Sequence, residues 1–183
     1  ATITYLDGTE EATMVSSPVT ISLNSNLALS LTARYFDDNH VPLGEGPVPF
    51  KVGETTRVRI PVHITNSLHE LTSLTLDLSL GSPSVRVVSM NMEAGDMHED
   101  AERRSVVWSL NRFPPSVSKI QGFIDVSVTP SSQEADKVLH ILESATLSAQ
   151  DAATLGSIKI QQGLITSRLE DDPFAKGKGI VVR

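Results

Sequence analysis

Apolar residues fall on every second position in one segment of this chain after another. The clearest case is the segment 58–64, where Val58, Ile60, Val62 and Ile64 alternate with polar residues or proline. Successive residues of a strand point to opposite faces, so this period predicts a strand with one buried face and one face in water. An amphipathic helix would need a period near 3.6 instead. The segment is therefore expected to be a half-buried strand.

The polar row of that strand contains Arg57, Arg59 and His63, with Pro61 between them. We interpret this row as the solvent face of a sheet. The alternative, a basic stripe that binds a ligand, is supported by no motif nearby. Because proline has no N–H to give to a ladder, Pro61 predicts that the strand lies at a sheet edge or contains a bulge.

Similar alternation recurs along the chain, in runs with these apolar residues: Leu27, Leu29 and Leu31; Leu74, Leu76, Leu78 and Leu80; Val106, Trp108 and Leu110; Ile120, Ile124, Val126 and Val128. Segments rich in Gly, Pro, Asn and Asp separate the runs, and the segment 93–104 (EAGDMHEDAERR) is expected to be a long charged loop. About ten strands with turns at regular spacing predict an all-β antiparallel sandwich.

The segment 131–150 is compatible with either a helix or a strand. As a helix it would be capped by Ser132 and would place Val138 and Leu142 on one face. As a strand it would turn Glu143 toward the core together with its apolar neighbours. We favour the strand, because the preceding TPSS resembles the other turns that connect strands in this sequence.

Residues 1–23 predict a β-hairpin, because Asp7-Gly8 is a strong two-residue turn signal. Its candidate assembly face consists of Ile3, Tyr5, Val19, Ile21 and Leu23. A two-stranded hairpin alone is marginal in water, and its free edges recruit other strands. We expect the sheet of the main sandwich or a neighbouring copy to complete it. The plausible hinge NSN, which follows the hairpin, favours the neighbouring copy.

Composition excludes several classes of function. The 183 residues are 39% hydrophobic, enough for one large sandwich or one and a half small domains, and carry a net charge of −7. This charge argues against nucleic acid and anionic membranes as partners. Without cysteine there is no disulfide, thiol nucleophile or thiolate metal site. No run reaches membrane-spanning length and no signal peptide is present, so we expect no membrane insertion by these residues.

No motif of an enzyme or a metal site stands out, so we expect no catalytic residue, no metal and no cofactor. There is no G-x-S-x-G elbow, and the five histidines form no zinc-hydrolase pattern. The acidic residues of 93–104 lack the spacing of an EF-hand, and FDDNH and EDDP are typical of turns. Trp108 lies in one row with Val106 and Leu110, so we expect it in the core rather than as a sugar-stacking platform.

Two long segments resemble a known family. The segment 52–80 (VGETTRVRIPVHITNSLHELTSLTLDLSL) is similar to a pattern in which VG precedes an alternating strand, an Asn-containing turn and a second alternating strand. The segment 105–132 (SVVWSLNRFPPSVSKIQGFIDVSVTPSS) resembles the later V-x-W, the Pro-containing turn and the strand ending in V-x-P. Both patterns belong to the conserved-repeat, immunoglobulin-like domains of prokaryotic surface proteins.

Segments 27–54 and 169–182 resemble a narrower group, the large membrane-anchored proteins of candidate-phylum bacteria. The chain departs from the family at RIPVHITNSLHE, where Pro61 and two histidines replace a strand rich in Thr, Trp and Tyr. The resemblance implies an immunoglobulin-like sandwich over residues 26–183. It also implies that residues 1–23 are the closing hairpin of a preceding domain or an assembly strand.

The resemblance further implies a non-catalytic structural module of a cell-surface or extracellular protein, part of a longer membrane-anchored chain. Such a module would act as a spacer, a stalk or a subunit of a self-assembling filament, with protein partners that include copies of itself through strand pairing. The alternative is an adhesin-like module that recognises a glycan or a protein through loops such as 92–103. Exposed aromatic residues in a loop cluster would favour binding, and a sheet edge filled by another chain would favour assembly.

Overall fold

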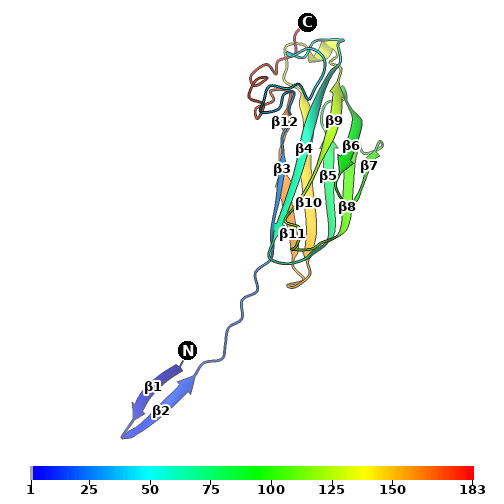
Figure 1. Cartoon of the computed structure of the whole chain (residues 1–183). Helices are drawn as coiled ribbons and strands as arrows, with labels where there is room; N and C mark the ends of the chain where they lie inside the picture. The colour runs from blue at the N-terminus through cyan, green and yellow to red at the C-terminus, as the bar shows by residue number, and fades with distance from the viewer. Residues whose placement is uncertain (1) are drawn as a thin grey trace.

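The computed structural model describes residues 2–183, and it contains a hairpin and a sandwich joined by an extended segment (Figure 1). The hairpin consists of β1 (Thr2–Asp7) and β2 (Glu10–Val15). Residues 16–25, called the arm below, lie in no strand and lead into the sandwich. The predicted fold class, an all-β antiparallel immunoglobulin-like sandwich preceded by a hairpin, is confirmed.

Two antiparallel sheets face each other in the sandwich. The smaller sheet has the strand order β3 (Asn26–Leu31), β4 (Thr56–Ser67), β9 (Lys119–Val128) and β6 (Val85–Met92). The larger sheet has the order β11 (Ser157–Gln162), β10 (His140–Asp151), β5 (Leu71–Leu80), β8 (Ser105–Phe113) and β7 (Asp96–Asp100), and the short β12 (Ile165–Thr166) also pairs with β10. The edges β3 and β11 lie on one side of the sandwich, and β6 and β7 on the other.

The alternation found in the sequence matches the burial of side chains along the strands. On β4, Val58, Ile60, Val62 and Ile64 are buried, whereas the residues between them are exposed or half-buried. The inner faces of β5, β8 and β9 follow the same rule. Apolar side chains from both sheets therefore form one core between the layers.

Pro61 does not mark an edge, and this prediction from the sequence is wrong. Strand β4 lies between β3 and β9, and Pro61 pairs with Phe123 of β9 without a register shift. The backbone N–H groups of Arg57 and Arg59 point away from β9, where they donate to the carbonyls of Glu45 and Arg34. By the period of two, the position of the missing N–H of Pro61 faces that same side, where β3 has already ended at Leu31.

The segment 93–104 is not the long loop that its charge predicted. Residues 96–100 form the edge strand β7, which pairs with β8 from Asp96–Ser109 to Asp100–Ser105. Charged side chains are suited to such an edge, because they discourage pairing with other chains. A loop adhesion surface at 92–103 is therefore not what the structure contains.

The segment 131–150 forms a strand after a single 3-10 turn at Ser132–Glu134. Its register against β5 shifts between Leu142 and Ser144, so Glu143 lies in a bulge and is exposed. The bulge removes the objection that a strand would turn this carboxylate into the core. The C-terminal segment 177–183 (GKGIVVR) forms no strand of its own and makes the isolated bridges Lys51–Val182 and Val138–Ile180.

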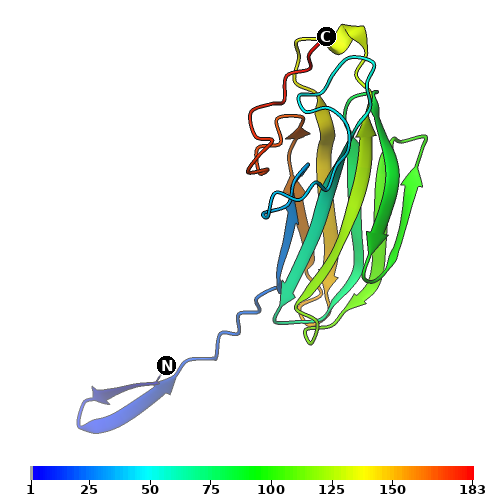
Figure 2. The same ribbon diagram turned by 45° about the horizontal axis from the view of Figure 1, so that its top comes forward.

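The sandwich has two distinct ends along its long axis (Figures 1 and 2). At one end, called the base, Ser25 meets the β4–β5 turn and the β10–β11 turn. At the other, called the far end, lie the loop 32–55, the 3-10 turn and residues 168–183. The arm leaves from the base and carries the hairpin away from the sandwich.

Candidate interaction site

The hairpin turns through two residues, Gly8 and Thr9, because Asp7 pairs directly with Glu10. Gly8 has a φ of +69°, which the tight turns of hairpins require and glycine adopts without strain. The turn thus lies one residue after the predicted centre at Asp7-Gly8. Val15 pairs with Thr2, and the chain leaves the hairpin at that point.

One face of the hairpin is apolar. Ile3 lies opposite Met14 and Tyr5 lies opposite Ala12, so these four side chains share a face. Ile3, Tyr5 and Met14 are 62%, 47% and 60% exposed. Ile3 and Tyr5 were predicted from the sequence, whereas Met14 and Ala12 were not, although their places follow from counting the antiparallel register outward from the glycine turn.

Val19, Ile21 and Leu23 do not belong to the hairpin, so this part of the prediction is wrong. They lie in the arm, with exposed fractions of 86%, 79% and 68%. Their spacing of two places them in one row wherever the arm is extended. The sequence from Ala12 to Ala33 contains no charged residue, and the arm includes the β-branched Val19, Thr20 and Ile21, so it is an uncharged segment of the kind that pairs with other strands.

The arm is fixed to the base at Ser25. Its backbone N–H donates to Oδ2 of Asp151 over 2.7 Å, its hydroxyl donates to the carbonyl of Ser67, and the N–H of His69 donates to its hydroxyl oxygen over 2.7 Å. Asp151 is fully buried and also accepts from the backbone N–H groups of Ala153 and Thr154 and from Nδ1 of His69. These contacts fix the direction in which the arm departs.

The charge of Asp151 is stabilised by its donors. Burial alone would raise the pKa of this carboxyl, but hydrogen bonds from the backbone of Ser25 and Thr154 and from His69 hold it well below its ordinary value. Asn24 is held at the same place, because the hydroxyl of Thr154 donates to its Oδ1 over 2.5 Å. The arm therefore leaves the sandwich directly beside the β10–β11 turn, where β11 begins.

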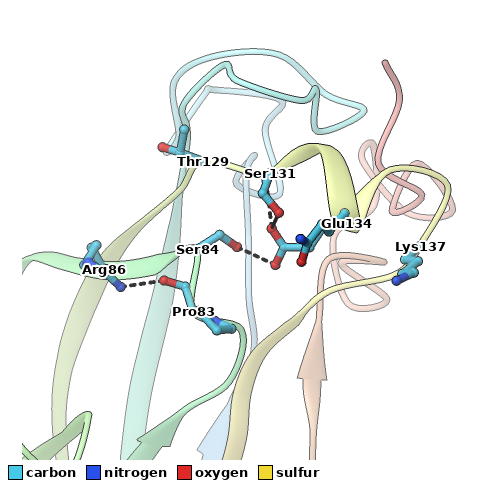
Figure 3. Close-up of a pocket in the computed structure, with 8 residues that line it drawn as sticks. Pro83, Ser84, Arg86, Thr129, Ser131, Glu134 and Lys137 are labelled. Atoms are coloured by element: carbon cyan, nitrogen blue, oxygen red, sulfur yellow. Dashed lines mark hydrogen bonds between the residues drawn. The ribbon is translucent and has the colours of Figure 1, made fainter.

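A groove of about 640 Å³ lies at the far end of the sandwich (Figure 3). Glu134 lies in it and accepts from the N–H and hydroxyl of Ser131, from Ser84 over 3.0 Å and from Ser82. Burial would raise the pKa of Glu134, and these hydrogen bonds outweigh it and lower the pKa. The carboxylate thus links the 3-10 turn to the β5–β6 turn, which is a structural role.

A second cluster at the far end was not anticipated from the sequence. The aromatic cluster consists of Tyr35, Phe36, His40 and Phe174, and the ring of His40 stacks on Phe174 with centroids 4.0 Å apart. His40 and Phe174 are both exposed. No periodic pattern connects residues 35–40 with residue 174, so only the folded chain shows that these rings meet.

Asp172 holds together the two segments that carry the aromatic cluster. Its buried carboxylate accepts hydrogen bonds from the backbone N–H groups of Tyr35, Phe36, Phe174 and Ala175. Burial raises the pKa of Asp172, but the four bonds lower it below its ordinary value. The prediction that EDDP supplies turn chemistry is confirmed. The same holds for FDDNH, because Asp37 accepts from two N–H groups of its own loop.

The polar row of β4 is occupied by contacts within the fold. Arg59 forms a double hydrogen bond to Asp125, at 2.7 and 2.9 Å, and its guanidinium lies 4.1 Å from the ring centre of Phe123. Burial raises the pKa of Asp125, but bonds from Arg59 and Ser89 lower it below its usual range. The row therefore lies on the outer face of a sheet, and Arg59 stabilises the pairing of β4 with β9 through its contacts with Asp125 and Phe123.

Trp108 lies in the core of the sandwich, fully buried. Its Nε1–H donates to the carbonyl of Ala94 over 2.7 Å, so the one polar atom of the ring has a partner. Residues 2–183 contain no group of three or more His, Asp or Glu side chains placed to hold a metal ion. In the same part of the chain, no helix has the length and hydropathy needed to cross a membrane.

No protein-family model and no curated protein matches this sequence. Similar solved structures include the full-length major pilin SpaD from Corynebacterium diphtheriae, with 10% identity and a TM-score of 0.48 over 77% of this chain and 34% of the pilin. BcpA, the major pilin subunit of Bacillus cereus, has 9% identity and a TM-score of 0.48 over 90% of this chain and 46% of the pilin. This chain therefore spans less than half of either pilin, and at these scores the likeness indicates neither a family nor a function.

Proposed function

We propose that this chain is a non-catalytic structural module of a cell-surface or extracellular protein, and that its hairpin and arm join it to other β-structure. The observation that carries the proposal is the apolar face of Ile3, Tyr5 and Met14, which is exposed on a hairpin held away from the sandwich (Figure 1). A module of this kind acts as a spacer, a stalk or an assembly subunit.

Energetics favour a partner for the hairpin. A two-stranded hairpin alone is at best marginally stable in water, whereas burial of its apolar face contributes about 25 cal/mol for each Å² removed from water. Both strands also have an outer edge of backbone N–H and C=O groups, because the sheet of β1 and β2 contains no third strand. A protein that supplies a further strand or an apolar face would satisfy both needs.

The shape of the molecule supports a role as a spacer. The arm leaves from the base, and residues 168–183 lie at the far end (Figures 1 and 2). A polypeptide that enters at one end and leaves at the other adds the length of the sandwich to whatever it connects. The resemblance of segments 52–80 and 105–132 to surface domains supports a place on the cell surface, within a longer membrane-anchored protein.

The proposal is tested with a chain that begins at Asn24, which keeps Ser25 as an amide donor to Asp151. We expect the shortened chain to stay folded by circular dichroism and to be monomeric by light scattering, while the full chain associates. A full-length variant, Ile3→Ser with Met14→Ser, should lose association as well, whereas Thr4→Ser on the opposite face should retain it. Unfolding of the shortened chain would show that the hairpin belongs to its own core.

A second candidate function, the binding of a glycan or protein through loops, is favoured by the aromatic cluster. Phe174 is 38% exposed, and its ring stacks with that of His40. The two rings together form an exposed aromatic surface of the kind on which a sugar could stack. If the cluster binds glycans, Phe174→Ala should abolish retention on immobilised cell-wall polysaccharide, and Leu155→Ala, at an exposed residue of the base, should not. Equal retention of both variants would remove this candidate.

A further inference from the structure

We propose that the outer edge of β11 in a second copy of this chain is the acceptor for the arm, so that two copies exchange arms. The inference rests on the proposed function, in which hairpin and arm join the module to other β-structure. Besides the two-residue β12, four strands of the sandwich pair on one side only, namely β3, β6, β7 and β11. They differ in how well their edges are protected against further pairing.

Two of these edges are protected. Strand β7 carries Asp96, Glu99 and Asp100, and the hairpin that travels with the arm is itself acidic, with Asp7, Glu10 and Glu11. Strand β6 has a register shift against β9 between Val87 and Ser89. Charges and bulges are among the devices that natural proteins use to keep edges from pairing.

The other two edges lie side by side. Strand β3 continues directly from the arm of its own chain, and its last carbonyl, that of Leu31, accepts a hydrogen bond from Nε2 of Gln162 over 2.8 Å. Strand β11 pairs with β10 over all six of its residues without a register shift. Its single charged residue is Lys159, whereas β7 carries three acidic residues. We take the edge of β11 as the acceptor, because it is regular over its whole length and the end of β3 is contacted by Gln162.

The arm fits this edge residue by residue. The segment 19–24 (VTISLN) has six residues, as does β11. Antiparallel pairing with Leu23 opposite Ile158 places Ile21 opposite Ile160 and Val19 opposite Gln162. Directly opposite residues share a face of the sheet, so the apolar row of the arm would lie on the inner face. There it would cover Leu29, Ile158 and Ile160, which the sandwich leaves half-buried.

The same register accounts for the remaining residues of the arm. Ser22 falls opposite Lys159 and Thr20 opposite Gln161, so polar side chains share the outer face. Pro18, which has no N–H to give, falls opposite Gly163, just beyond the end of β11. A shift by one residue would turn Val19, Ile21 and Leu23 outward, so the pattern of the arm selects this register.

The geometry of the base favours a second copy over the arm's own sandwich. A return of the arm onto its own β11 would need a reversal at Asn24 and Ser25, which Thr154 and Asp151 hold in the outward direction. An extended arm runs toward its base, whereas β11 runs away from the base. Antiparallel pairing between copies therefore sets the two bases facing each other, and each copy donates one arm about a two-fold axis.

Cysteine cross-linking of the full chain tests this register, because the natural sequence contains no cysteine. Ser22→Cys and Lys159→Cys would face each other across an antiparallel pair, where Cα atoms lie about 4.5–5.5 Å apart and a disulfide forms without strain. The two single variants, one with a mass tag, are mixed and oxidised. We expect a covalent heterodimer of twice the 19.7 kDa of the chain. Ser22→Cys mixed with His98→Cys, on the edge of β7, should give none.

The outcomes separate this inference from the proposed function. A heterodimer through Lys159→Cys supports the exchange. Cross-linking only within one chain, seen when both cysteines are on the same molecule, would mean that the arm covers its own β11 and would overturn it. Cross-linking to His98→Cys would also overturn it and would leave assembly through the arm intact. Absence of every cross-link, with a scattering mass of one chain, would overturn both.

Discussion

The backbone N–H of Ser25 donates a hydrogen bond of 2.7 Å to Oδ2 of Asp151, which lies 126 residues further along the chain. This bond lies where the arm meets the sandwich. The same carboxylate oxygen of Asp151 lies 3.0 Å from Nδ1 of His69. Buried carboxylates with several donors are rigid, because every lone pair has a partner. The arm therefore starts at a residue that is hydrogen-bonded to the base.

We predict that Asp151→Asn lowers the midpoint of urea unfolding. The amide keeps the shape of the side chain, but its NH2 group faces N–H donors where the carboxylate accepted, and buried donors are left without a partner. Glu143→Gln, which alters an exposed carboxylate of the same strand, is the matched control and should leave the midpoint nearly unchanged. Equal midpoints for both variants would show that Asp151 does not stabilise the base.

Trp108→Ala should destabilise the fold by about 3–5 kcal/mol, because a fully buried indole is replaced by a cavity. Trp108→Phe should cost less, since it keeps a ring in the core and loses mainly the hydrogen bond to the carbonyl of Ala94. Free energies of unfolding from urea titrations measure both. Full stability of Trp108→Ala together with lost ligand binding would instead assign this residue to a binding site.

The strands of the sandwich could be predicted because their apolar residues alternate and their turns are rich in Gly and Pro. Leu74, Leu76 and Leu78 were assigned to one face, and all three are buried. The edge strand β7 could not be found in this way, because an edge strand needs few apolar residues and its acidic side chains are typical of loops. Likewise, the sequence shows that Pro61 has no backbone N–H to donate. It does not show whether a paired strand or a loop lies on the side to which that N–H would point.

The candidate site was predicted only in part. Ile3 and Tyr5 lie on the hairpin face as expected, since a glycine turn fixes the antiparallel register. Val19, Ile21 and Leu23 have the same alternation as a paired strand, and alternation alone does not reveal whether a partner strand is present. The aromatic cluster joins residues 35–40 to Phe174 through the backbone bonds of Asp172, a long-range contact that leaves no local pattern.

Calcium is expected to leave the melting temperature unchanged within about one degree. No cluster of three or more acidic or histidine side chains in residues 2–183 is placed to hold a cation. A ligand at 100 times its dissociation constant would add about 2.7 kcal/mol of stability, and each kcal/mol shifts the melting temperature of a chain of this size by about 2–4 °C. A calorimetric shift of several degrees with calcium but not with magnesium would show a site in the acidic segments.

Acid is expected to destabilise the sandwich, and the sign follows from four buried or half-buried carboxylates that accept hydrogen bonds. Asp125, Glu134, Asp151 and Asp172 all have a pKa below the ordinary value in the folded chain. The folded state therefore binds fewer protons than the unfolded state once the pH approaches about 4, and the stability present above that pH is lost as it falls further. Urea titrations between pH 6 and pH 2.5 measure the loss.

Asp172→Asn is the variant that isolates one of these groups. Its side chain no longer titrates, so its free energy of unfolding should be lower than that of the natural chain at pH 6, and the difference should narrow as the pH falls below 4. Glu143→Gln again serves as the exposed control and should follow the natural chain throughout. A difference that stays constant from pH 6 to pH 2.5 would mean that the charge of Asp172, as distinct from its shape, contributes nothing to the packing of the far-end loops.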